Sequence, residues 1–420
     1  MTNQYKRTAY LAPELPSLSA TFVTNEIWAL EDLGVEVHPF SVHPPKHPAH
    51  GSRAAELAAR TPVLYSQTFL AACFALLWNA FYHKRSTLKA LFRLGSDIVK
   101  SGIISKTAFK LIYQFLRSAW LAREMRVRNI EHLHIHFAHV PTQIGMYASA
   151  LAGVPYTFMT HANDLFERPL LIKEKIDRAL QAISISNFNV DIMEQKKGDR
   201  SKISIVRCGV ETTPEYASSQ LMLDRGFYLI GTLGRLVEKK GVDTLISAAK
   251  QLKEKGIPVR IEIAGDGPLR KKLVEQVKDC ELSDSVVFLG AMPHYQVLKW
   301  MRSLDAFVLA GKKDINGDMD GIPVVLMEAM ERGVPVLSTR LSGIPELVIH
   351  DKTGLLSNPD DPEGLSKNLA DLYQNQNLAN RLASEAKLFI REEFDRKLNA
   401  KRLLTIINTP QEQVQRTMAA

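Results

Sequence analysis

Short apolar segments alternate with helix-like segments along this chain, and the alternation starts twice. The first run comprises a predicted strand at residues 8–11, a proline-rich loop at 13–22, a helix at 23–33 and a strand at 35–40. Such alternation favours a parallel sheet covered by helices, which binds ligands at the carboxyl ends of its strands. The sequence therefore predicts an α/β protein, and its 420 residues are enough for two domains.

The second run restarts the pattern after an irregular stretch at residues 208–226, which we predict to be a linker. Its predicted strands lie at residues 227–233, 259–264, 286–290, 306–309, 336–339 and 354–356. The predicted domains are therefore residues 1–207 and 227–385, each with a Rossmann-like sheet, followed by a helical segment at 386–420.

Two carboxylates, Asp320 and Glu328, stand on either side of seven residues in the second predicted domain. Gly321 and Pro323 favour a tight entry into a helix, because proline is tolerated in a first turn. The first amides of such a helix are a natural seat for phosphate, and Glu328, about two turns in, would reach a hydroxyl-bearing ligand. The alternative is an amphipathic helix with solvated carboxylates.

A glycine-bounded basic loop follows the first strand of the same domain, at residues 234–241. Arg235 and Lys240 lie on this loop with four residues between them. Fixed cations of this kind suit a diphosphate that gains negative charge, since arginine grips two oxygens and lysine acts as a point charge. Taken alone, the loop is as typical of a solvated basic turn as of a diphosphate-binding site.

Together these features resemble the E-x7-E motif and basic loop of retaining GT-B glycosyltransferases of the family-4 type, with Asp320 in place of the first glutamate. The resemblance covers nearly the whole chain and is strongest from residue 228 to 356. The loop at 13–22 and the run at 320–323 resemble the branch that builds exopolysaccharides such as colanic acid and amylovoran. The resemblance implies two Rossmann-like domains that face a central cleft, with a C-terminal helix at 388–408 that returns to the N-terminal domain.

The resemblance also implies a role for each site residue. Arg235 and Lys240 would bind the donor diphosphate, and Glu328 would hold the ribose hydroxyls. The transferred sugar would be held by Asp320 and by the backbone of Gly321 and Ile322. The base would lie against backbone around residues 265–268 and 289–294, which include Gly265 and Gly290.

Two residues of the first predicted domain complete the implied site. His161 matches a histidine that lies near the donor sugar in the family; the alternative is a strand-end histidine with a structural hydrogen bond. Ser19 would contact phosphate or acceptor, but it suits equally well a cap on the helix that follows it.

The implied chemistry retains the anomeric configuration. We expect departure and attack on one face of the sugar, because no carboxylate is placed as a nucleophile. No metal or other cofactor is expected, since Arg235, Lys240 and helix amides would neutralise the diphosphate. Asp318 and Asp320 have Asp-x-Asp spacing, but Asp320 belongs to the motif itself.

Residues 131–137 alternate strictly and place His132, His134 and His136 on one face of a predicted strand. Three histidines on one face of a strand suggest a zinc site. We do not assign a metal, because no fourth ligand or carboxylate partner is evident nearby. His136 remains a candidate for the site.

Positive charge is concentrated in the first half of the chain. Residues 84–128 hold 11 lysines and arginines against only Asp97 and Glu124, interleaved with apolar residues at helical spacing. Such helices suit an anionic membrane surface or, alternatively, form a solubilising face. Nucleic acid is a less favoured partner, because no nucleic-acid module accompanies the charge.

The predicted location is the cytoplasm, at the inner face of the cell membrane. The longest apolar run, residues 69–81, is too short to span a bilayer, and no secretory signal precedes it. Three widely spaced cysteines, Cys73, Cys208 and Cys280, suggest buried thiols in a reducing compartment.

The leading hypothesis is a glycosyltransferase that moves a sugar from a nucleoside diphosphate donor to a lipid-linked oligosaccharide. Two alternatives remain open at this point. A sugar-nucleotide isomerase shares the architecture, and a non-catalytic membrane-docking protein would carry a degenerate version of the site.

Overall fold

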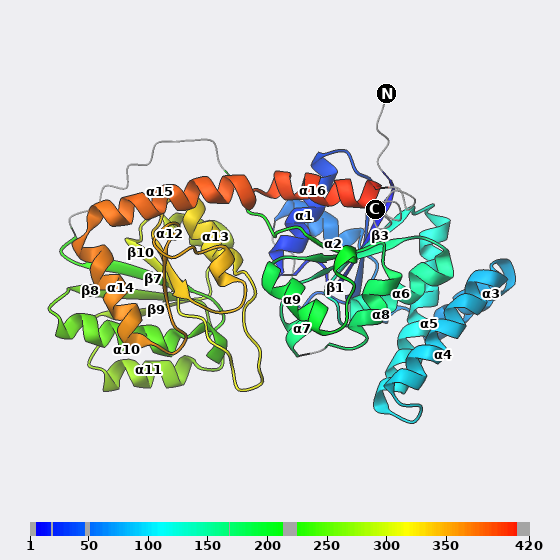
Figure 1. Ribbon diagram of the computed structural model, residues 1–420, viewed down its shortest axis with the longest axis horizontal. Coiled ribbons are helices and arrows are strands. Elements are labelled where there is room, and N and C mark those ends of the chain that lie inside the picture. The colour runs from blue at the N-terminus through cyan, green and yellow to red at the C-terminus, as the bar shows by residue number, and fades with distance from the viewer. Residues whose placement is uncertain (1–5, 18–19, 47–50, 168, 213–224, 410–420) are drawn as a thin grey trace. The chain divides into compact units, whose positions relative to one another are not determined.

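The computed structural model describes residues 6–17, 20–46, 51–167, 169–212 and 225–409. These residues form two compact units, the first comprising Met1–Arg207 and Arg396–Ala420 and the second Cys208–Asp395. Each unit contains one six-stranded sheet in which neighbouring strands run parallel (Figure 1). The predicted α/β fold is therefore confirmed. Most of the predicted linker, residues 213–224, lies outside the described residues.

The sheet of the first unit has the strand order β2-β1-β3-β4-β5-β6. Its strands are β1 (Thr8–Glu14), β2 (Val37–His43), β3 (His132–His136), β4 (Tyr156–Thr160), β5 (Gln181–Ser184) and β6 (Ile203–Ile205). The chain runs from β1 to one neighbour and then crosses to β3 on the other side, so the topological switch point lies between β1 and β3. Strands β3 and β4 are buried along their whole length, as in parallel sheets covered on both faces.

Ten α-helices of the described residues belong to this unit. They are α1 (Thr21–Asp32), α2 (Ser52–Ala59), α3 (Phe69–Tyr82), α4 (Lys84–Ser101), α5 (Lys106–Val127), α6 (Val140–Ala152), α7 (Asn163–Phe166), α8 (Ile172–Arg178), α9 (Asn187–Gln195) and α16 (Arg396–Asn408). Helix α6 has Pro141 in its first turn and ends at Gly153 with a left-handed φ of 70°. All its residues from Pro141 to Ala152 are buried, because it packs against both the sheet and α5.

The C-terminal part of the chain differs from the predicted single helix at 388–408. Helix α15 (Gln376–Glu393) belongs to the second unit, and α16 begins at Arg396 and packs against α1 in the first unit. Phe394 and Asp395, the two residues between these helices, are held by hydrogen bonds to the segment that follows β6. The carbonyl oxygen of Phe394 accepts a hydrogen bond from the Val210 amide at 2.9 Å, and the Asp395 carboxylate accepts one from the Thr212 hydroxyl at 2.5 Å.

The sheet of the second unit has the order β12-β11-β10-β7-β8-β9, so its switch point lies between β7 and β10. Its strands are β7 (Tyr228–Leu233), β8 (Val259–Ala264), β9 (Val286–Gly290), β10 (Ala306–Leu309), β11 (Val336–Thr339) and β12 (Leu355–Ser357). The helices besides α15 are α10 (Val242–Glu254), α11 (Arg270–Asp279), α12 (His294–Met301), α13 (Val324–Glu331) and α14 (Pro362–Gln374). Parallel sheets of this kind bind ligands at the switch point, beyond the carboxyl ends of the strands.

No helix among the described residues is long and apolar enough to cross a bilayer. Of the three cysteines, Cys208 is buried, whereas Cys73 and Cys280 are partly exposed. The expectation of buried thiols therefore holds only for Cys208.

A buried ion pair fixes helix α4 to the rest of the first unit. The Arg178 guanidinium donates to both oxygens of Asp97, at 2.7 and 2.6 Å, and the Tyr147 hydroxyl donates to the same carboxylate at 2.8 Å. Asp97 is fully buried, so its charge depends on these donors.

We expect Asp97→Ala to lower the free energy of unfolding of the first unit by about 3–5 kcal/mol, because it leaves the Arg178 charge buried without its partner. Urea unfolding curves test this. The control is Asp191→Ala, at an exposed position of α9, which should change the free energy by no more than about 0.5 kcal/mol. Similar values for the two variants would contradict a structural role for the buried pair.

Candidate functional site

The carboxyl ends of three strands of the second unit converge around glycine residues. The Gly234 amide, just after β7, donates to the Ala264 carbonyl at 3.1 Å, and the Gly265 amide donates to the Gly290 carbonyl at 2.7 Å. Gly265 has a φ of 116°, and a Cβ there would lie 2.0 Å from the Gly234 oxygen. Only glycine allows this approach, so Gly265 and Gly290 belong to the same edge as the basic loop.

The basic loop also meets the segment that follows β10. Gly241 has a φ of 61°, and a Cβ on it would lie 1.7 Å from the carbonyl oxygen of Ala310. The contact places Lys240, at the end of the short helix η3 (Glu238–Lys240), beside the motif. As a result, Lys240 Nζ lies 2.5 Å from Asp320 Oδ2, although the two residues are 80 positions apart in sequence.

A second lysine completes this cluster. Lys239 Nζ lies 2.6 Å from Asp318 Oδ2 and 3.7 Å from Asp320 Oδ1. Burial lowers the pKa of Lys239, but the carboxylates of Asp320 and Asp318 raise it by more, so that the net shift is upward. Both carboxylates of the Asp-x-Asp pattern are therefore bound by ammonium groups.

Arg235 is the exposed cation of the basic loop. It makes no ion pair with any residue in the part of the chain that the structure describes. The two lysines and two aspartates beside it balance each other, and Glu238 of the same loop balances the charge of Arg235 without pairing with it. The guanidinium is therefore available to grip the oxygens of an anionic ligand.

The motif helix begins later than expected. Helix α13 starts at Val324, because Pro323 has an extended backbone (ψ 121°) and serves as its N-cap residue. Glu328 therefore lies about one turn into the helix, and the prediction of two turns is wrong. Its Oε1 lies 2.9 Å from His294 Nε2, and this hydrogen bond raises the pKa of His294.

Gly321 and Ile322 precede α13 and are buried. The Gly321 carbonyl accepts a hydrogen bond from the Ser342 hydroxyl at 3.3 Å. Three side chains beside the predicted site were thus not predicted: those of Lys239, His294 and Ser342, although the backbone of residues 289–294 was expected near the base. Lys239 carried a signal as part of the same basic loop, whereas His294 and Ser342 follow other strands, β9 and β11, and only the strand order brings them near the motif.

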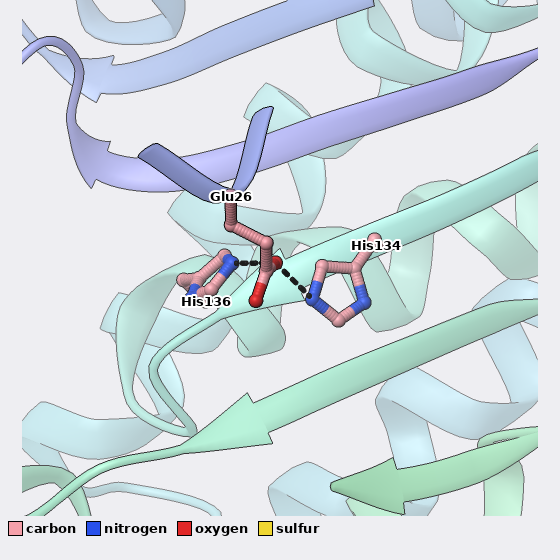
Figure 2. A group of neighbouring side chains, drawn as sticks. All are labelled: Glu26, His134 and His136. Atoms are coloured by element: carbon pink, nitrogen blue, oxygen red, sulfur yellow. Dashed lines mark hydrogen bonds and ion pairs between the residues drawn. The ribbon is translucent and has the colours of Figure 1, made fainter. Parts of the chain in front are cut away.

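His161 lies directly after β4 in the first unit and belongs to a buried polar cluster. His136 Nδ1 is 3.1 Å from His161 Nε2, and His136 Nε2 is 3.0 Å from Glu26 Oε1. The Tyr10 hydroxyl donates to the same Glu26 oxygen at 2.6 Å. Figure 2 shows Glu26, from α1, between His134 and His136 of β3.

The expectation that no carboxylate lies near the three histidines is therefore wrong. Glu26, His134 and His136 offer ligand-type atoms within 4.8 Å of one another. Glu26 Oε1 already accepts hydrogen bonds from Tyr10 and His136, however, and it lies 3.6 Å from His134 Nε2. His132 is not part of this group. Its Nε2 and the Nδ1 of His134 both lie within hydrogen-bond distance of the Thr157 hydroxyl. His134 Nε2 is buried and has no hydrogen-bond partner among the described residues, so the network leaves this one atom of the group unsatisfied.

Burial depresses the pKa values of three histidines in this part of the sheet. It lowers the pKa of His132 to about 3 and those of His134 and His161 well below the ordinary value, and it raises the pKa of Tyr10. His136 stands between Glu26 and His161, with one ring nitrogen within hydrogen-bond distance of each, so that it links the carboxylate to His161.

The backbone of His161 is also held firmly. Its amide donates to the Asp164 carboxylate at 3.1 and 3.2 Å, and its carbonyl accepts from the Asn189 amide group at 2.5 Å. The ring packs against Phe22 and Phe137. Ser19, the other candidate in this unit, lies outside the described residues.

We expect Glu26→Ala to lower the free energy of unfolding of the first unit by about 2–4 kcal/mol, because Tyr10 and His136 lose a charged, buried acceptor. Asp32→Ala, on the same helix α1, is the control: its ion pair with Arg53 is surface-exposed and should contribute less than about 1 kcal/mol. Urea unfolding measures both, and equal losses would contradict the role given to Glu26.

The buried histidines also predict a pH dependence. Their folded-state pKa values are depressed, so the unfolded state binds more protons below pH 6.5 and stability falls as the pH is lowered. As the pH falls from 6.5 to 5, the cost of each such histidine should rise from about 0.7 to about 1.4 kcal/mol per pH unit, as the unfolded-state imidazole becomes fully protonated. Tryptophan fluorescence reports this, since Trp28, Trp78 and Trp120 lie in the first unit. His132→Gln should flatten the slope by about one histidine's share, and an unchanged slope would contradict the assignment.

The chain is similar in sequence to known glycosyltransferases. Residues 217–389 match the family model "Glycosyl transferases group 1". The chain is 29% identical over 392 residues to the putative colanic acid biosynthesis glycosyltransferase WcaL of Escherichia coli K12, covering 88% of this chain and 91% of that protein. It is 33% identical over 208 residues to the amylovoran biosynthesis glycosyltransferase AmsK of Erwinia amylovora, covering 49% of this chain and 50% of that protein.

Solved structures share the fold. The crystal structure of Anabaena Alr3699/HepE in complex with UDP superimposes with a TM-score of 0.69 at 16% identity, covering 94% of this chain and 98% of that one. At this identity the likeness speaks for the architecture, and it agrees with the two six-stranded parallel sheets.

Proposed function

We propose that this chain, which belongs to the group 1 (family-4) glycosyltransferases of GT-B fold, transfers a sugar from a nucleoside diphosphate donor to a lipid-linked oligosaccharide during exopolysaccharide assembly. That it is a nucleotide-sugar glycosyltransferase follows from the family. The acceptor and the site residues are the parts that we propose.

The observation that carries the proposal is the ion pair between Lys240 and Asp320. It joins the basic loop after β7 to the carboxylate motif before α13, at the switch point of the second sheet. We propose that the Arg235 guanidinium, which has no competing ion pair, and Lys240 bind the donor diphosphate. Amides at the start of α13 would add to the positive field.

The remaining contacts of the donor are proposed from the same arrangement. Glu328 would accept from the ribose hydroxyls, and Asp320 with the backbone of Gly321 and Ile322 would hold the transferred sugar. The base would lie near Gly265 and Gly290, where the backbone turns at the strand ends leave no bulky side chain. The lysines that bind Asp318 and Asp320 make a divalent cation unnecessary at that place.

In the reaction that we propose, the bond between the anomeric carbon and the diphosphate breaks while the acceptor hydroxyl attacks from the same face. The departing phosphate oxygen takes the proton of the acceptor hydroxyl, and the configuration is retained. Arg235 and Lys240 would stabilise the negative charge that develops on the diphosphate. We propose His161 as a contact of the transferred sugar, with its ring held in place by His136 and, through His136, by Glu26.

The names of the relatives, which place them in colanic acid and amylovoran biosynthesis, support exopolysaccharide assembly. The lipid-linked acceptor and a location at the inner face of the cell membrane are our proposal, from the basic and apolar helices of residues 84–128. A sugar-nucleotide isomerase of the same fold would instead convert the donor with no acceptor. Product analysis separates the two, because only a transferase releases a nucleoside diphosphate.

A thermal-shift screen against UDP, GDP, ADP and dTDP tests the donor site. We expect one of the four to stabilise the protein by about 2.7 kcal/mol at a concentration one hundred times its dissociation constant. The double variant Arg235→Ala/Lys240→Ala should abolish this stabilisation, because it removes the two cations proposed to bind the diphosphate.

The matched control is Lys271→Ala/Lys272→Ala, which removes two exposed cations from α11 and should leave the shift unchanged. Release of the same nucleoside diphosphate from its sugar conjugate, upon addition of a lipid-linked oligosaccharide, then tests transfer. Stabilisation by none of the nucleotides, or an equal shift in both double variants, would contradict the site assignment.

A further inference from the structure

The exposed apolar residues of this protein are concentrated on three helices. Fifteen of the twenty-one exposed large hydrophobic side chains in the described part of the chain lie between Phe69 and Tyr113. The exposed fraction is 78% for Leu70, 80% for Phe92 and 93% for Ile104. Exposed apolar side chains gathered in this number on neighbouring helices mark a site of interaction, because soluble proteins rarely leave large apolar surfaces uncovered.

The residues belong to α3, α4 and α5, which lie side by side in the first unit (Figure 1). On α4 the exposed apolar positions Leu88, Phe92 and Val99 recur at helical spacing, so they form one stripe along the helix. Ile103 and Ile104 extend this surface into the turn between α4 and α5. We call the exposed side of these helices, residues 69–113, the apolar helical face.

The charges on the apolar helical face have one sign. Lys84, Arg85, Lys89, Lys106 and Lys110 are exposed and make no ion pair within the described chain. Between Glu56 and Glu124, a stretch described in full, the only carboxylate is Asp97, which is buried and held by Arg178. The face therefore presents cations and apolar groups with no exposed acid.

We infer that the apolar helical face inserts into the interfacial region of an anionic phospholipid bilayer. Apolar side chains would enter the acyl boundary while the lysines contact lipid phosphates, as in helices that lie in the membrane plane. A merely solubilising surface would bury its apolar side and expose charges of both signs, and this face does the opposite. A protein partner would not require the acid-free composition.

The inference deepens the proposed function. The benefit of membrane docking rests on that function, because a lipid-linked acceptor is confined to the membrane surface. Docking through the first unit would hold the enzyme at the plane where that acceptor is anchored. The basic side chains would draw the protein to the surface, and the aromatic and aliphatic side chains would retain it there.

Co-sedimentation with vesicles tests the inference on the full chain. We expect binding to vesicles of phosphatidylcholine and phosphatidylglycerol and much weaker binding to phosphatidylcholine alone. Phe92→Ser/Ile104→Ser should lower the partition coefficient by roughly tenfold or more for each apolar side chain removed. Lys89→Gln/Lys110→Gln should lower it by roughly fivefold for each charge removed.

Two matched controls lie in the second unit: Leu388→Ser, at an exposed apolar position of α15, and Lys271→Gln/Lys272→Gln. Both should bind vesicles like the parent protein. Raising the salt from about 0.1 M to about 1 M should weaken the binding, because the Debye length falls from roughly 10 Å to roughly 3 Å. The Phe92→Ser/Ile104→Ser variant should remain folded and keep its nucleotide-induced thermal shift.

Failure of the parent protein to bind anionic vesicles would overturn the inference. Vesicle binding that the Phe92→Ser/Ile104→Ser substitutions leave unchanged would also overturn it. So would a dimer of the parent protein, formed without lipid, that these substitutions dissociate, because the face would then belong to a second copy of the chain. Vesicle binding without any nucleotide-induced shift would leave the docking surface standing and contradict the proposed function instead.

Discussion

The order of the parallel strands determines where chemistry is possible in this protein. In each sheet the chain builds outward from one strand and then crosses to its other side, which leaves a switch point between β1 and β3 and another between β7 and β10. Loops that leave neighbouring strands in opposite directions cannot fill the space between them. In the second unit, the approach of Gly241 to the Ala310 carbonyl then brings Lys240 to Asp320. Both the charge pair and the exposed Arg235 beside it depend on that backbone contact.

The side chains near the two switch points differ in charge and in burial. The second unit presents partly exposed lysines and aspartates that balance each other and one arginine that is unpaired, which suits a multiply charged ligand that arrives and leaves. The first unit holds Glu26 among Tyr10, His134 and His136, nearly all of it out of contact with water. There a single carboxylate lies among aromatic and imidazole rings, and His136 links it to His161 by hydrogen-bond distances of 3.0 and 3.1 Å.

The sequence predicted the fold well because strand–helix alternation is a local pattern, and strands β8, β9, β10 and β11 begin and end where predicted. It also predicted the basic loop and the carboxylate motif. It did not predict that Glu26 lies beside the three histidines, because Glu26 and His136 are 110 positions apart and only the strand order makes them neighbours. His294 was missed for the same reason, and the later start of α13 depends on the backbone of Pro323, which composition does not reveal.

The apolar helical face shows a further limit of sequence periodicity. A helical period tells which residues share a side, but it does not tell which side is buried. On α3 the buried residues are Ala72, Ala75 and Asn79, while Phe69, Phe74 and Phe81 are exposed. Small residues facing inward let α3 and α5 approach closely, as the hydrogen bond from Asn79 to the Ala119 carbonyl at 3.2 Å shows. The large residues must then face outward, where water alone gives them no favourable contact, and a bilayer with anionic headgroups satisfies both them and the lysines around them.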